Sequence, residues 1–167
     1  NQLIMKKLIL VIGIALVGFS VNAQNFNVGV SGGIPTGDNS DFYSFGIILD
    51  ANYLYDVSEE FSVGATTGFI YSLLDSDFEG DDAGFLPIAA AARYSISEEF
   101  VLGADLGYAL GVTPSELDGG FYYAPKLQYY FTETISGVVS YRGISVDSDA
   151  GGSASFDHIT FGVEFKL

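Results

Sequence analysis

A turn phrase that occurs three times divides this chain into strands. Each copy has an aromatic residue, a short polar break that contains Ser or Thr together with Glu, and then an apolar residue. The copies read Tyr55-Asp56-Val57-Ser58-Glu59-Glu60-Phe61, Tyr94-Ser95-Ile96-Ser97-Glu98-Glu99-Phe100 and Tyr129-Tyr130-Phe131-Thr132-Glu133-Thr134-Ile135. Longer, acidic, Gly-rich loops lie between the copies. Three tight turns interleaved with four longer loops predict eight antiparallel strands.

The C-terminal stretch shows the strand pattern clearly. Bulky apolar residues fill one face, at Ile159, Phe161, Val163, Phe165 and Leu167, and residues 158, 160, 162, 164 and 166 on the other face are smaller or polar. This period-two alternation is typical of a β-strand with two different surroundings. The less apolar face is mostly Gly, Ser, Thr and Ala, which suits a narrow lumen. The pattern predicts an all-β fold, an eight-stranded antiparallel up-and-down transmembrane β-barrel with its apolar band facing lipid.

A secreted soluble barrel is the alternative, but its outer face would carry many Lys and Glu. Aromatic residues gather at the predicted strand ends, as an aromatic girdle requires. They are Phe42, Tyr43, Tyr55, Phe61, Tyr94, Phe100, Phe121, Tyr129 and Phe131. Pro87 and Pro125 fall inside predicted strands, where we expect β-bulges.

The first 23 residues have the features of a cleavable signal peptide. Lys6-Lys7 precede an apolar run from Leu8 to Phe19, and small residues follow up to Ala23. We therefore expect residues 1–23 to be a signal peptide, residues 24–167 to be one outer-membrane β-barrel domain, and Met5 to be the true start. Cys is absent, so disulfides and a lipidated Cys are excluded.

The chain is strongly acidic, and removal of the signal peptide would make it more so, because Lys6 and Lys7 are lost. The four remaining strong cations, Arg93, Lys126, Arg142 and Lys166, face all 21 acids, which is a formal net charge of −17. Nucleic-acid binding needs a basic surface, so this partner is excluded.

These features together resemble the small eight-stranded outer-membrane β-barrels of the OmpX and OmpA transmembrane-domain type. The C-terminal residues Phe161, Val163, Phe165 and Leu167 resemble the signal read by the barrel-assembly machinery, although that signal usually ends in Phe. The turn phrases and acidic loops are similar to Bacteroidetes-type barrels. The resemblance implies contact with outer-membrane lipid and lipopolysaccharide, both termini in the periplasm and four extracellular loops.

Seven charged residues fall on the predicted inner face. They are Asp50, Arg93, Asp105, Lys126, Arg142, Glu164 and Lys166. Buried charges must be paired, because an isolated one is costly. We expect a register that sets Arg93 opposite Asp105, with Lys126 near them, and a lumen plugged by an ion-pair network. An ion-conducting path is the alternative.

The second predicted loop begins like a calcium loop. Its acids alternate and a Gly follows, but Leu86 stands where an EF-hand requires Glu. We therefore expect at most weak divalent-cation binding, with ions that bridge the loop to anionic lipid headgroups; simple solvation of the loop is the alternative. The residues concerned are Asp75, Asp77, Glu79, Asp81 and Asp82.

His158 is the one histidine, and Ser153, Ser155 and Asp157 lie near it in sequence. A Ser, a His and an acid can form a nucleophilic site. However, strand parity puts Asp157 on the face opposite His158. We expect no enzyme, no catalytic residue, no confident metal site and no cofactor. A lipid A-modifying hydrolase or acyltransferase is the alternative.

We expect a monomeric outer-membrane barrel with a structural or surface-interaction role. A narrow porin-like channel for ions or small solutes is the first alternative, and the lipid-modifying enzyme is the second. The four loops are expected at Pro35 to Phe42, Leu74 to Gly84, Thr113 to Gly120 and Asp147 to Phe156.

Overall fold

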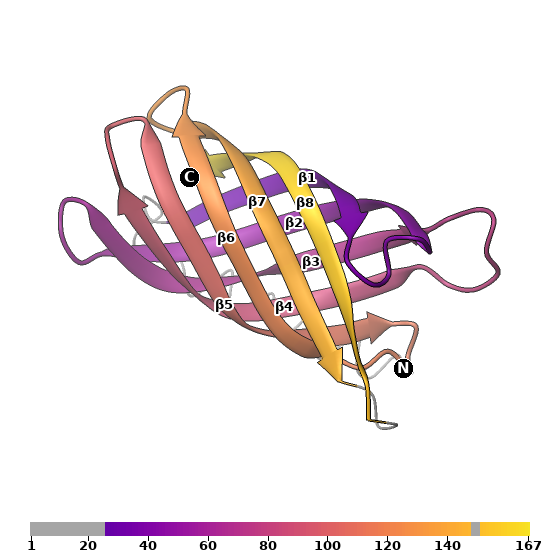
Figure 1. The fold of residues 1–167 in the computed structure, drawn as a ribbon. Coiled ribbons are helices and arrows are strands. Elements are labelled where there is room, and N and C mark those ends of the chain that lie inside the picture. Colours follow the sequence, from indigo (N-terminus) through magenta and orange to yellow (C-terminus); the bar gives the residue numbers. More distant parts are fainter. Residues whose placement is uncertain (1–25, 148–150) are drawn as a thin grey trace.

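The computed structural model describes residues 26–147 and 151–167, so the predicted signal peptide lies outside the described residues. These residues form eight strands (Figure 1). The strands are β1 (Phe26–Thr36), β2 (Tyr43–Asp56), β3 (Phe61–Leu74), β4 (Ala83–Ser95), β5 (Phe100–Thr113), β6 (Gly120–Tyr130), β7 (Ile135–Asp147) and β8 (Ser153–Lys166).

Each strand pairs with its neighbours in the chain, and β1 pairs with β8 to close the barrel. Val30 on β1, for example, lies opposite Leu49 on one side and opposite Val163 on the other. All the pairings are antiparallel. Closure leaves no strand edge with unpaired backbone groups, which is the condition for spanning lipid with strands. The predicted eight-stranded up-and-down barrel is confirmed.

Strand β5 shows how the barrel separates its two faces. Val101, Asp105 and Ala109 point inward and are buried, whereas Leu102 and Leu106 point outward and are 48% and 56% exposed. Soluble monomers rarely leave such a large apolar surface in contact with water. The exposed face is therefore suited to a lipid environment.

The three copies of the turn phrase form the same turn. In each, the Ser or Thr hydroxyl accepts a hydrogen bond from the backbone N–H three residues later: Phe61 to Ser58 (3.1 Å), Phe100 to Ser97 (3.1 Å) and Ile135 to Thr132 (3.0 Å). The backbone N–H of the same Ser or Thr donates to the carbonyl of that later residue. Figure 1 shows the three short turns together at one end of the barrel.

The aromatic residues predicted at the girdle are exposed on the barrel, with one exception. Tyr43 turns inward and packs against Phe156, with their ring centroids 5.6 Å apart. An irregularity in register between Tyr43 and Phe45 changes the face on which the strand places its first residue. The prediction of Tyr43 as a girdle residue is therefore wrong.

The expected bulges at Pro87 and Pro125 are also wrong. No register shift falls at either proline, although each proline and one neighbour are unpaired in one ladder. The shift in the β4–β5 ladder falls between Gly84 and Phe85. Proline has no N–H to donate, so its strand loses ladder bonds without inserting a residue. A neighbouring hydroxyl instead donates to each proline carbonyl: Thr67 Oγ1 to Pro87 at 2.8 Å and Ser140 Oγ to Pro125 at 3.0 Å.

The longer connections lie at the end opposite the short turns (Figure 1). They agree with the predicted loops, although residues 148–150 of the fourth lie outside the described residues. The first connection is tied to the start of β8, because Asn39 Nδ2 donates to the Ser155 carbonyl at 2.8 Å. Within residues 26–147 and 151–167, no helix is long and apolar enough to cross a membrane.

Candidate functional site

Inward-pointing buried side chains form three layers along the lumen, and the strand registers give their order from the short-turn end to the long-loop end. The amide–carboxylate layer comprises Asn27, Asn52, Gln128, Ser136 and Glu164. The ion-pair layer comprises Asp50, Arg93, Asp105, Lys126 and Arg142. The apolar layer comprises Ile48, Ile70, Phe85, Ala109 and Ile144. All fifteen residues are buried.

Asp105 on β5 is the centre of the first ion-pair group. Its Oδ1 lies 2.7 Å from Arg93 Nη1, and its Oδ2 lies 2.7 Å from Lys126 Nζ. The three side chains come from adjacent strands β4, β5 and β6. Two cations on one carboxylate leave this group with one excess positive charge.

The predicted register of Arg93 and Asp105 is wrong by two residues. Arg93 lies opposite Gly103, and Asp105 lies opposite Ala91. Their contact is therefore diagonal, which an arginine is long enough to make on the same face. Gly103 is needed beneath it, because a Cβ at that position would stand 2.8 Å from Arg93 Cδ.

Arg142 on β7 and Asp50 on β2 form the second ion-pair group. Arg142 Nη1 and Nη2 donate to the two carboxylate oxygens at 2.8 and 2.7 Å. Arg142 Nη1 also donates to the Tyr122 hydroxyl at 3.2 Å, and Nε donates to Thr160 Oγ1 at 3.2 Å. Every nitrogen of this buried guanidinium has an acceptor, and these hydrogen bonds offset the cost of removing its charge from water.

Glu164 is held differently from the two aspartates. Its carboxylate accepts hydrogen bonds from Asn52 Nδ2 (3.0 Å) and Gln128 Nε2 (2.8 Å), and none of the described cations lies in ion-pair contact with it. Asn27 Nδ2 donates in turn to Asn52 Oδ1 at 2.8 Å. Lys166 is exposed at the short-turn end. Two of the seven predicted network residues, Glu164 and Lys166, therefore lie outside the ion pairs.

The apolar layer was missed by sequence reasoning. Ile48 and Phe85 have no exposed surface, and Ile70 and Ile144 are 1% exposed. Tyr43, Leu117, Val146 and Phe156 pack against this cluster. The available signal was strand parity, because each of the four residues falls on the inner face near the loop end of its strand.

His158 lies inside the barrel beyond the apolar layer. Its Nε2 shares a hydrogen bond of 3.1 Å with Ser72 Oγ, and both residues are buried. Gly46 provides space for the imidazole, because a Cβ there would lie 2.7 Å from His158 Cδ2. Asp157 is bonded instead to the Tyr141 hydroxyl at 2.8 Å. The Ser–His–acid combination considered from the sequence is therefore not assembled around His158.

One acid of the second loop, Asp82, stabilises the loop through hydrogen bonds to the end of β3. Asp82 accepts hydrogen bonds from the Leu74 backbone N–H (2.8 Å) and the Tyr71 hydroxyl (2.7 Å). These two hydrogen bonds lower the pKa of Asp82 below its usual value, and the bond from the Leu74 N–H contributes more than the bond from the Tyr71 hydroxyl. No cluster of three or more His, Asp or Glu suited to hold a metal is present in the described part of the chain. Weak cation binding by this loop stays a prediction.

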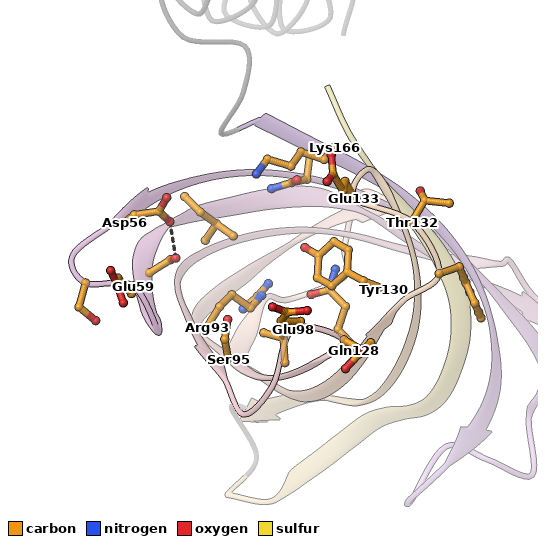
Figure 2. Close-up of a pocket in the computed structure, with 17 residues that line it drawn as sticks. Asp56, Glu59, Arg93, Ser95, Glu98, Gln128, Tyr130, Thr132, Glu133 and Lys166 are labelled. Atoms are coloured by element: carbon orange, nitrogen blue, oxygen red, sulfur yellow. Dashed lines mark hydrogen bonds between the residues drawn. The ribbon is translucent and has the colours of Figure 1, made fainter.

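A hollow opens at the short-turn end of the lumen (Figure 2). We call it the vestibule; its volume is about 520 Å³. Arg93, Gln128 and Asn27 line its buried part, and Tyr130 lies beside them. Five exposed acids and one exposed cation line the rest of it, namely Asp56, Glu59, Glu98, Glu99, Glu133 and Lys166.

The predicted assembly signal lies on the closing strand. Phe161, Phe165 and Leu167 are exposed on the outer face, and Val163 pairs with Val30 of β1. The Leu167 N–H donates to the Phe26 carbonyl at 2.9 Å. Recognition by the assembly machinery stays a prediction.

Solved structures of outer-membrane barrels share this fold. Ail, the attachment invasion locus protein of Yersinia pestis, is 16% identical with a TM-score of 0.51, over 84% of this chain and 96% of that one. The N-terminal β-barrel domain of Pseudomonas aeruginosa OprF is 12% identical with a TM-score of 0.54, over 85% and 97%. Neisserial surface protein A is 15% identical with a TM-score of 0.52, over 86% and 97%.

The chain thus has the fold of the small eight-stranded outer-membrane β-barrels, as its sequence resemblance implies. No protein-family model matches the chain, and no curated protein sequence does. Identities of 12% to 16% show a shared fold and do not carry a function across. The Bacteroidetes likeness stays a prediction.

Proposed function

We propose that this protein is a sealed outer-membrane barrel with a structural or surface-interaction role. The observation that supports this proposal is that two layers of buried side chains lie across the lumen. An eight-stranded barrel has an interior just wide enough for side chains to fill. Here the ion-pair layer and the apolar layer lie one behind the other, so a solute would have to displace both.

The two layers oppose different solutes. A hydrated ion would have to separate Asp50 from Arg142, or Asp105 from its two cations, and then enter a region of Ile and Phe side chains. An apolar solute would have to displace the buried charges. This combination supports the sealed barrel over the porin-like channel.

The outer surfaces support the rest of the proposal. The exposed Leu, Ile, Val, Phe and Tyr side chains suit contact with outer-membrane lipid and lipopolysaccharide. The first and second connections, which together carry seven acids from Asp38 to Asp82, would present an acidic surface outside the cell. The short turns and the C-terminal residues would then lie in the periplasm, and one copy would act alone.

Single-channel recording on the full chain in planar bilayers tests the seal. We expect no steady current from the wild type, from Arg93→Ser, or from Phe85→Ala, because each variant leaves one layer in place. Insertion must be verified in the same bilayers by protease protection and by the heat-dependent gel shift of a folded barrel.

Steady current steps from the wild type would overturn the sealed barrel and favour the channel. A step that appears only in Arg93→Ser would show that the apolar layer does not close the lumen. If the wild type is silent but overexpression alters lipid A, the enzyme alternative gains support.

A further inference from the structure

An apolar groove crosses the outer wall of the barrel near the short turns. We call it the lateral groove; its volume is about 250 Å³, and it lies over strands β5 to β8. Strands β6, β7 and β8 lie side by side in this part of the wall (Figure 1). The exposed side chains that line the groove point away from the lumen, so the groove is separate from the ion-pair layer.

Gly137 on β7 leaves the lateral groove open. It falls on the outward side of its strand, between the exposed Ile135 and Val139. Apart from its neighbours in the chain, only ring atoms of Phe131 among the described residues would lie within 4 Å of a Cβ at Gly137, at 3.1 and 3.2 Å. A large side chain at position 137 would therefore occupy the groove.

Aromatic rings form the walls of the groove on either side of β7. Tyr129 contacts Phe100 and Phe131 edge-to-face, with ring centroids 4.9 and 5.3 Å apart. Ring pairs in this geometry are favourable beyond the area they bury, so the three rings form a stable wall. Phe161 on β8 stands on the other side, opposite Val139 in the register and 56% exposed.

The groove opens on the surface that faces lipid, and its shape suits an acyl chain. Side chains that line an empty hollow lose dispersion contacts, which a narrow and flexible chain can restore. A second copy of the barrel would have to insert a protruding side chain and also match the curved wall around the groove. A hollow of this size supplies little of the roughly 1,200–2,000 Å² that a stable protein interface buries.

The charges beside the groove favour one kind of headgroup. Glu98 and Glu99 lie in the β4–β5 turn and Glu133 lies in the β6–β7 turn, and all three are exposed. Lys166, at the end of β8, is the one exposed Lys or Arg of the described residues. The three carboxylates outnumber this ammonium, and their field acts over a Debye length of about 8 Å. An anionic headgroup is therefore disfavoured, and a headgroup with its own ammonium is favoured.

We propose that the lateral groove binds one acyl chain of a phospholipid whose headgroup carries an ammonium, such as phosphatidylethanolamine. The chain lies over Gly137 against the aromatic wall, and the ammonium lies among the carboxylates of the two turns. This inference rests on the membrane placement proposed above, in which the short turns face the periplasm.

Native mass spectrometry of the full-length protein in detergent tests the proposal, with phosphatidylethanolamine and phosphatidylglycerol of identical acyl chains. We expect one retained phosphatidylethanolamine, bound several-fold more tightly than phosphatidylglycerol. In deuterated micelles, NMR should show nuclear Overhauser contacts from the acyl methylenes to the Val139 methyl groups and the Phe161 ring. Contacts to Val63, exposed on β3 away from the groove, should be weaker.

Protein variants separate the chain from the headgroup. Gly137→Leu fills the groove and should weaken retention of phosphatidylethanolamine at least ten-fold. Ala65→Leu adds a leucine to the exposed face of β3 and should bind like the wild type. Replacing Glu98, Glu99 and Glu133 together by Gln should reduce the preference for phosphatidylethanolamine several-fold and leave the contacts to Val139 in place.

Equal retention by Gly137→Leu and the wild type would overturn the proposal, and so would equal binding of the two phospholipids. A lipid-free dimer that is lost in Gly137→Leu would also overturn it, because a second copy would then occupy the groove. If Gly137→Leu does not fold, the contacts to Val139 and the headgroup preference still decide the question. Steady current in planar bilayers would reject the sealed barrel and leave the lipid result unaffected.

Discussion

Arg142 on β7 holds both carboxylate oxygens of Asp50 on β2, although β8 and β1 stand between these strands in the barrel wall. The pair therefore spans the lumen and links two parts of the wall that share no backbone hydrogen bonds. Charge-assisted bidentate contacts of this kind are both strong and geometrically specific.

Arg142→Met should lower stability strongly. It leaves Asp50 buried without a cation, and breaking a buried ion pair costs about 3–5 kcal/mol. Thermal and urea unfolding in detergent measure the loss. Replacing both partners, as Asp50→Leu with Arg142→Met, should recover part of it. Lys166→Met at the exposed end is the matched control and should change little; an equal loss there would contradict the interpretation.

Ser97→Ala should destabilise the β4–β5 turn. The hydroxyl accepts from the Phe100 N–H at 3.1 Å, and a lost hydrogen bond of this kind costs about 0.5–1.5 kcal/mol. Ser97→Thr is the control and should be near neutral, because Thr132 makes the same bond in the third turn. Equal melting of the Ala and Thr variants would show that the backbone bonds alone hold the turn.

The second loop should loosen at acid pH. The Leu74 N–H and the Tyr71 hydroxyl favour ionised Asp82, so the pKa of Asp82 is lowered in the folded state. The stabilisation is then complete above the unfolded pKa, about 3.9, and is lost as the pH falls through the lower folded pKa. The amide shift of Leu74 measures this by NMR. Asp82→Asn should abolish the transition, and Asp77→Asn should leave its midpoint unchanged.

Ser72 should not react with a fluorophosphonate probe in the folded barrel. Ser72 has no exposed surface and His158 is 2% exposed, so their contact is structural. His158→Ala should instead lower stability by about 1–3 kcal/mol, because it leaves the Ser72 hydroxyl buried without this partner. Ser153→Ala, in the exposed part of β8, should melt like the wild type. Labelling of Ser72 would revive the enzyme alternative.

The strand count, the loop positions and the two faces were predictable because they depend on local chemistry. Period-two alternation distinguishes the two faces of a strand, and the Ser/Thr turns mark where a strand ends. Both signals lie within a single hairpin. The contacts across the lumen were not predictable in the same way. Parity puts Arg93 and Asp105 on one face but cannot tell a direct pair from a diagonal one, and the Ser72–His158 contact exists only after the barrel closes.

The apolar layer escaped prediction for a related reason. Ile48 and Ile47 are identical side chains at adjacent positions, and only the strand phase shows that Ile48 is buried while Ile47 is exposed. At Tyr43 the irregular register interrupts that phase, and the side chain is inside against expectation. Where the alternation of a strand is unbroken, the sequence predicts which side chains point inward. Where a register irregularity interrupts the alternation, only the structure shows it.

The pairing of β1 with β8 has a consequence for how this barrel reaches its native state. The other seven pairings join successive strands, so their paired residues are close together in the sequence. The seam joins residues 27–36 to residues 157–166 and must wait until the last strand is present. We therefore expect seam formation to be the slowest step of folding, since it carries the largest loop-closure entropy.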